Sequence, residues 1–256
     1  MFQRIFATAL GAGVAVGLIV AVLQHFSLVP LILEAEKYED GILKVEHKHT
    51  QLAPRPDDIG AAVAGALPTV IGQAQAHDDH PAVNAAGITD DSPWRAVFTF
   101  IATTLTATGF ALLLAGAFAV SGREVDAREG LLWGLAGFTA FALAPAFGLP
   151  PELPGSVAAE LTARQAWWIG TMAATLIGLG LLVFVRRAWT IPVAIVLLVA
   201  PHLIGAPHPH EGAGLVPPEL AATFAARSLG VNAVLWALLG LATGALYARF
   251  GRAKPA

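Results

Sequence analysis

Six long apolar segments dominate the sequence and restrict what it can fold into. They cover residues 5–33, 95–120, 130–149, 165–185, 188–206 and 223–248. Each approaches or exceeds the roughly 20 residues that a helix needs to cross about 30 Å of hydrocarbon. Because lipid offers no hydrogen-bond partners to the backbone, such segments cross a membrane as helices. We therefore predict an all-α polytopic membrane protein with six transmembrane helices.

The composition agrees with a membrane protein and excludes several functions. Hydrophobic residues make up 56% of the chain and charged residues 13%, whereas a soluble domain carries about 25% charged residues. The absence of cysteine excludes disulfides, thiolate metal sites and cysteine nucleophiles. There is no P-loop motif for ATP hydrolysis, and the net charge of -3 does not indicate nucleic-acid binding. The predicted spans hold no paired acids or nucleophile constellation, so we do not expect an enzyme.

Arginine and lysine near the ends of the spans predict the orientation. Eight of them fall on one side of the predicted membrane: Arg4, Arg123, Arg128, Arg186, Arg187, Arg249, Arg252 and Lys254. The opposite short flanks hold Arg95, Arg164 and Arg227. Since cytoplasmic loops carry the excess of positive charge, we place both termini in the cytoplasm.

The predicted organisation has three parts. Residues 1–33 form the first transmembrane helix, 34–93 a polar extracytoplasmic segment, and 94–256 the remaining five helices of a single transmembrane domain. No small-x-small cleavage site follows Val22, so we expect the first helix to be retained rather than removed as a signal peptide. GxxxG pairs predict close helix contacts with partners that stay open: Gly13 and Gly17, Gly130 and Gly134, Gly240 and Gly244.

An internal repeat follows from the ends of the third and fifth spans. The stretch ALAPAFGLPPELPG (142–155) and the stretch LVAPHLIGAPHPHEG (198–212) share Ala-Pro, then Gly, Pro and Glu. Each precedes a helix with an arginine at its outer end, and the first pair of spans has the same outline. We infer three parallel two-helix units, a known transporter plan. The alternative is that prolines, acids and arginines collect at helix ends for separate reasons.

Histidines and acids gather on the predicted outer side. All eight histidines lie there, with fifteen of the eighteen acids. Neutral imidazole suits Co, Ni, Cu or Zn, and a carboxylate can complete a mixed ligand shell. The candidate metal ligands are therefore His202, His208, His210, Glu211, His25, Glu34, His47, His49, His77 and His80. For the paired loop histidines, the alternative is ordinary polar loop composition.

His202 differs from the other histidines because it is predicted to lie within the membrane. It follows Trp189 by thirteen residues, which places it about 20 Å along a helix that crosses about 30 Å. The preceding Pro201 removes a backbone hydrogen bond and bends the helix, as Pro145 does in the third span. An intramembrane ionisable group is a functional candidate; the alternative is a core histidine bonded to a neighbouring helix.

The outer glutamates have a competing structural role. Arg95, Arg164 and Arg227 can pair with them to hold the mouth of the protein together, and the pairs that we considered were Arg95 with Glu34, Arg164 with Glu152, and Arg227 with Glu211. Such pairing competes with metal binding. We favour the structural role for Glu34 and Glu152.

Several motifs in order resemble the CbtA family of predicted cobalt transporter subunits. They are VPLILEAEKYE (29–39), GLLWGLAGF (130–138), LAPAFGLPPELPG (143–155), RQAWW (164–168) and PHLIGAPHP (201–209), followed by VPPELAATF. The resemblance implies a polytopic inner-membrane protein linked to cobalt uptake for cobalamin synthesis. It also implies a small one-span companion, CbtB. Family members often carry a denser His/Glu run after LILEAE, which is reduced here to EHKH and HDDH.

From these observations we predict a permease that passes Co²⁺ inward, with the ion as cargo and no permanently bound cofactor. Outer histidines and acids collect the metal, and His202 receives it in a cavity beneath the kinks at Pro145 and Pro201. The alternative is a non-transporting metal-binding accessory that loads a partner. The residues alone do not select cobalt, because affinity rises from Co to Ni to Cu at such sites, and they leave the oligomeric state open.

Overall fold

Helices account for the regular structure of the described residues, which contain no strand. The computed structural model describes residues 2–50, 93–185, 187–209 and 215–252, with the backbone alone for 40–50 and 93. The helices are α1 Phe2–Ser27, α2 Val29–Thr50, α3 Pro93–Ser121, α4 Ala127–Phe138, the π-helix η2 Thr139–Leu143, α5 Ala144–Ala146, α6 Leu161–Gly180, the π-helix η3 Leu181–Val185, α7 Thr190–Ile204 and α8 Pro218–Arg252. The all-α prediction is confirmed for this part of the chain.

Five helical segments are long and apolar enough to cross a membrane. They are Phe2–Ser27, Trp94–Ser121, Ala127–Ala146, Leu161–Val185 and Pro218–Arg252. The fifth of the six expected spans corresponds to α7, which has 15 residues and therefore extends about 22 Å. That length falls short of the hydrocarbon thickness. The multi-pass character is confirmed, whereas the crossing by α7, and with it the total of six spans, remains a prediction.

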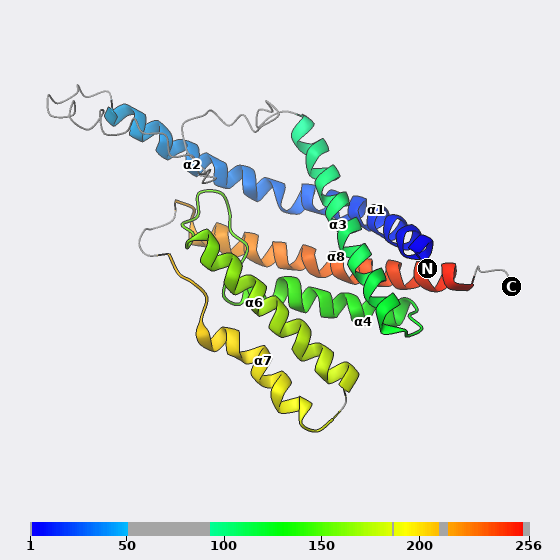
Figure 1. The fold of residues 1–256 in the computed structure, drawn as a ribbon. Helices are drawn as coiled ribbons and strands as arrows, with labels where there is room; N and C mark the ends of the chain where they lie inside the picture. The colour runs from blue at the N-terminus through cyan, green and yellow to red at the C-terminus, as the bar shows by residue number, and fades with distance from the viewer. Residues whose placement is uncertain (1, 51–92, 186, 210–214, 253–256) are drawn as a thin grey trace, which may run out of the picture.

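The helices form a bundle with its termini at one end. Helix α1 packs against α3 and α8, and α4 packs against α8. Helix α7 packs against α6, away from α1 and α3 (Figure 1). Arg4 joins the start of α1 to the end of α8: its Nε and Nη2 donate to the Tyr247 carbonyl at 2.8 and 2.6 Å. Its guanidinium also lies 3.6 Å from the centre of the Tyr247 ring. We call the opposite end, which the charge pattern predicts to face outward, the outer end.

The glycine pairs identified in the sequence lie at two tight helix interfaces. A Cβ atom at Gly17 of α1 would lie 2.6 Å from the Cα of Thr104 in α3. In α4 and α8 the two pairs face each other: a Cβ at Gly130 would lie 2.8 Å from the Gly244 Cα. Only glycine permits so close an approach of two backbones. The structure thus confirms the close packing and supplies its partners.

The first expected span, predicted as one helix over 5–33, is divided into two helices near Pro30. Helix α1 ends at Ser27 and α2 starts at Val29, because Pro30 has no amide hydrogen to continue the hydrogen-bond ladder of α1 but is tolerated in the first turn of a new helix. Helix α2 then continues to Thr50. The prediction of a loop from residue 34 is therefore wrong for residues 34–50, and residues 51–92 lie outside the described part.

The two predicted kinks have different structures. Before Pro145 the helix widens into η2, where the Ala144 N–H donates to the Thr139 carbonyl. Helix α7 instead runs through Pro201 and ends at Ile204, where the φ of +86° at the capping Gly205 terminates it. Helix α7 packs on α6 and η3. The three-unit repeat remains a prediction.

Candidate functional site

A cavity of about 630 Å³ opens near the outer end, between α6, α8 and the segment η2–α5, in which the helix that begins with α4 is interrupted. We call it the outer cavity. Its polar lining residues are Glu152, Arg164, Gln165 and Asn232. The remaining wall is apolar and includes Phe141, Pro145, Leu149, Trp168 and Leu229. Largely apolar pockets of this size with a few convergent polar groups are typical of binding sites.

An ion pair lies at the mouth of the outer cavity. Arg164 Nη2 donates to Glu152 Oε2 at 2.5 Å, and the two side chains are 27% and 30% exposed. Glu152 follows two prolines, whereas Arg164 lies in the first turn of α6. The Nε atom of Arg164 is buried and has no hydrogen-bond partner among the described residues. The structural pairing that we considered for Glu152 is therefore present, and Arg164 retains unused hydrogen-bonding capacity.

Glu160 positions Arg164 by capping α6. Its carboxylate accepts hydrogen bonds from the backbone N–H groups of Thr162 and Ala163 at 2.8 and 2.7 Å. These bonds hold the pKa of Glu160 below its ordinary value, and the bond from the Thr162 N–H has the largest effect. A side chain that satisfies the first amides of a helix fixes where the helix begins. The cap thereby places Arg164 at the end of the first turn, where its N–H donates to the Glu160 carbonyl at 3.1 Å.

Two amides inside the cavity were missed by the sequence reasoning. Asn232 lies five residues after Arg227 on α8, which is about 7 Å further along the helix. Its Nδ2 donates to the Ser228 carbonyl at 3.0 Å. Gln165 lines the cavity from α6. A usable signal existed for Asn232, because it is the only asparagine within the six apolar segments.

The irregular backbone before Pro145 forms part of the cavity wall. Phe141 and Ala142 belong to η2, and both line the cavity together with Pro145. Pro145 cannot donate a hydrogen bond to the Phe141 carbonyl, its usual helical acceptor. Irregular backbone at membrane depth is tolerated where it lines a cavity, and single-turn π-bulges in α-helices are frequent at functional sites. The outer cavity therefore lies beside Pro145, whereas a cavity beneath both Pro145 and Pro201 that holds His202 remains a prediction.

His202 lies at the end of α7, next to two aromatic rings. It is exposed, and its ring centre is 5.9 Å from that of Phe147 and 6.0 Å from that of Trp167. Trp167 Nε1 also donates to the Pro201 carbonyl at 3.2 Å. The two repeated motifs therefore meet around Trp167. His202 and Pro201 are not among the residues that line the outer cavity, and the role of His202 as a ligand remains a prediction.

Of the other predicted histidine ligands, two have side chains that the structure describes. His25 and His208 are exposed, and the His25 ring makes an edge contact with Phe26 at 5.3 Å. His47 and His49 lie on α2, where only the backbone is described. The predicted ligands outside the described residues are His77, His80, His210 and Glu211. The described residues contain no group of three or more His, Asp or Glu side chains that could hold a metal ion.

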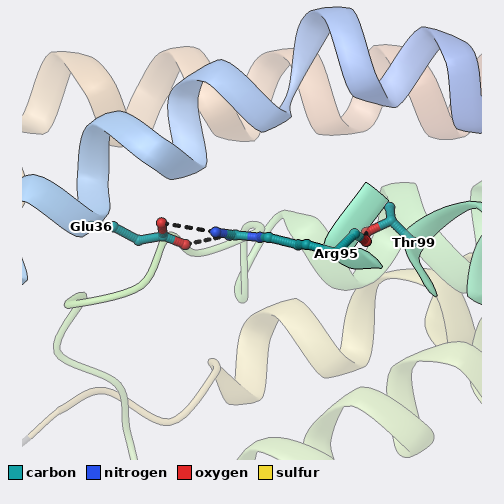
Figure 2. Close-up of polar contacts among 3 residues, drawn as sticks. All are labelled: Glu36, Arg95 and Thr99. Carbon is teal, nitrogen blue, oxygen red and sulfur yellow. Dashed lines mark hydrogen bonds and ion pairs between the residues drawn. The ribbon is translucent and has the colours of Figure 1, made fainter. Parts of the chain in front are cut away.

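The ion pairs near α2 correct one predicted pairing. Arg95 binds Glu36 rather than Glu34, with Nη1 donating to Oε2 at 3.1 Å and Nη2 donating to Oε1 (Figure 2). Positions two apart on a helix do not share a face, so Glu34 turns away and binds Lys37 at 2.8 Å. This hydrogen bond raises the pKa of Lys37 above its ordinary value.

Arg227 contacts the end of the first helix. Its predicted partner Glu211 lies outside the described residues. Arg227 Nη1 donates to the Ser27 carbonyl at 3.3 Å, so it joins α8 to the point where α1 ends. The contact supports a structural role for this arginine.

Comparison with known proteins gives a family. A family model described as "Probable cobalt transporter subunit (CbtA)" matches residues 2–248. No curated protein and no solved structure matches the chain. The match covers nearly the whole sequence and agrees with a multi-pass membrane protein that works as a subunit. The chain therefore belongs to the CbtA family of probable cobalt transporter subunits.

Proposed function

We propose that this chain carries Co²⁺ inward across the bacterial inner membrane, together with a small one-span CbtB-like companion. The uptake supplies cobalamin synthesis, and both termini face the cytoplasm. The observation that carries the proposal is an outer cavity beside a broken membrane helix, in a chain whose family is one of probable cobalt transporter subunits. Discontinuous helices at membrane depth are typical of ion sites in transporters.

The polar residues of the outer end suggest how the ion enters. Histidines and carboxylates first collect it from solution, among them His202, which is exposed beside Phe147 at the end of α7. Glu152 then exchanges its contact with Arg164 for the ion, since a divalent cation competes with a guanidinium for the same carboxylate. Asn232 and Gln165 offer amide oxygens deeper in the cavity. Neutral nitrogen and oxygen ligands both suit Co²⁺.

The membrane potential is a sufficient driving force for the proposed direction. It favours inward movement by about 2.3 kcal/mol per charge per 100 mV, and a divalent cation gains twice that. No ATP-hydrolysing motif is therefore required of the chain itself.

Purified protein in liposomes tests the proposal. An inside-negative potential is imposed, and entry of added Co²⁺ is followed with a trapped metal-sensitive dye, with and without the companion. We expect uptake that falls at least tenfold in His202→Ala and in Asn232→Leu, because loss of even an outer-shell partner of a metal ligand typically costs about 10–100-fold. Thr106→Ala, on the exposed face of α3, is the control that should not change the rate.

Two outcomes would count against the permease. Binding of Co²⁺ without uptake, even with the companion present, would indicate the accessory that loads a partner. Uptake that is equal in the control and in both site variants would remove the outer cavity and His202 from the route.

A further inference from the structure

A second cavity, of about 580 Å³, lies at the end of the bundle that holds the termini. We call it the inner cavity. It is lined where α1 begins, where α3 ends, where α4 begins and where α8 ends. Because the ends of membrane helices mark the boundary between hydrocarbon and headgroups, this cavity lies at the level of the headgroups of one leaflet.

The walls of the inner cavity carry equal numbers of both charges. Three arginines come from three separate segments, namely Arg4 of α1, Arg123 of the loop after α3, and Arg252 of α8. Three carboxylates line it as well: Glu124, Asp126 and Glu129. Basic pockets between membrane helices bind lipid headgroups. A wall with balanced charge complements a zwitterion better than a simple anion.

Part of this charge is already held in place. The Arg4 guanidinium is bound to the Tyr247 carbonyl and lies over the Tyr247 ring. Asp126 accepts the Glu129 N–H at 2.9 Å and so caps α4. Arg123 and Arg252 are exposed, and the Arg123 guanidinium lies 5.8 Å from the centre of the Phe184 ring, a contact that leaves its N–H donors available. Arg123, Arg252 and the two glutamates are therefore the groups that a ligand can bind. These acids are not a metal centre, since the described residues hold no such group of three.

The surroundings of the cavity suit the rest of a lipid. Its inner wall is apolar and buried, with Phe118 fully buried and Tyr247 at 6% exposure. Beside it, Val120 of α3 is 89% exposed and follows Ala119, which lines the cavity. An acyl chain that leaves the headgroup therefore meets an apolar helix face.

We propose that the inner cavity binds the headgroup of phosphatidylethanolamine. Arg123 and Arg252 bind its phosphate, because guanidinium pairs with phosphate through two parallel hydrogen bonds. Glu124 and Glu129 accept hydrogen bonds from its ammonium group, which has three donors. This inference does not depend on which ion the protein carries.

Native mass spectrometry of the full chain in detergent tests the proposal. Phosphatidylethanolamine, phosphatidylglycerol and phosphatidylcholine with identical acyl chains are titrated separately. We expect phosphatidylethanolamine to bind most tightly, because phosphatidylglycerol lacks the ammonium group and phosphatidylcholine lacks the N–H donors. Equal binding of all three lipids, or tighter binding of phosphatidylglycerol, would overturn the proposal without any variant.

Charge variants then assign the binding groups. Arg123→Gln with Arg252→Gln should weaken phosphatidylethanolamine binding by about tenfold or more, the change expected from the loss of charge-assisted hydrogen bonds. Glu124→Gln with Glu129→Gln should reverse the preference toward phosphatidylglycerol. Arg227→Gln, at the other end of α8, is the control for loss of one positive charge. If both double variants keep the affinity and the preference of the unmodified chain for phosphatidylethanolamine, the inner cavity is not its binding site.

Discussion

The glycine contact between α4 and α8 leads to a quantitative prediction. A Cβ atom at Gly240 would lie 2.9 Å from the Cα of Gly134 and 3.0 Å from its nitrogen, and would also meet the Gly130 carbonyl. Non-bonded carbon atoms prefer about 3.5–4.0 Å. Gly240→Ala therefore forces the two helices apart by roughly 0.6 Å or more, against atoms of the backbone that cannot rotate away.

The expected cost follows from this overpacking. Extra methyl groups in a tightly packed interface cost about 1–3 kcal/mol. Alanine also gains about 1 kcal/mol over glycine from helix propensity, which partly masks the steric cost. Gly230→Ala on the same helix is the matched control, because a Cβ there meets no atom within 4 Å. The difference in stability between the two variants isolates the steric cost.

Reversible unfolding in detergent micelles measures this difference. We expect Gly230→Ala to be as stable as the unmodified chain or slightly more stable. Gly240→Ala should lie about 1–3 kcal/mol below Gly230→Ala. If the two alanine variants unfold at the same denaturant concentration, then α4 and α8 do not pack backbone to backbone, and the reasoning is refuted.

Three further predictions concern the ends of the bundle and the broken helix. Arg4→Gln removes the charge-assisted bonds to Tyr247 and should lower the stability by about 1–3 kcal/mol, measured by the same unfolding experiment; no change would show that the contact contributes nothing. The folded pKa of Glu160 is lowered, chiefly by the Thr162 N–H, so its stabilisation is complete above the ordinary pKa of 4.5 and is lost as the pH falls through the folded pKa. Glu160→Gln should therefore flatten the pH dependence of the melting temperature in that acid range, and an unaltered profile would contradict the cap. Pro145→Ala supplies an amide hydrogen to the helix and should slow Co²⁺ uptake while leaving the fold intact, as circular dichroism and liposome assays would check.

The sequence determined the number and type of most spans because hydrophobic length is a local property. A run such as 95–120 must cross as a helix whatever surrounds it, and α3 covers Pro93–Ser121. The glycine pairs and Pro145 were readable for the same reason, since the geometry that they impose depends on the residue itself. Charge sidedness placed Arg4 and Arg252 on one side of the membrane, and both line the inner cavity.

Only the tertiary structure decided which of these local features meet. Gly134 and Gly240 are more than a hundred residues apart in the sequence, and no local pattern specifies that pairing. The choice of Glu36 over Glu34 by Arg95 follows from the helical phase of α2, which sequence reasoning missed by treating that segment as a loop. Asn232 became part of a site only when α8 packed beside η2 and α6. Whether a segment crosses the membrane as a helix depends on the hydrophobicity of its own residues. Which helices pack together depends instead on how closely the surfaces of distant segments fit.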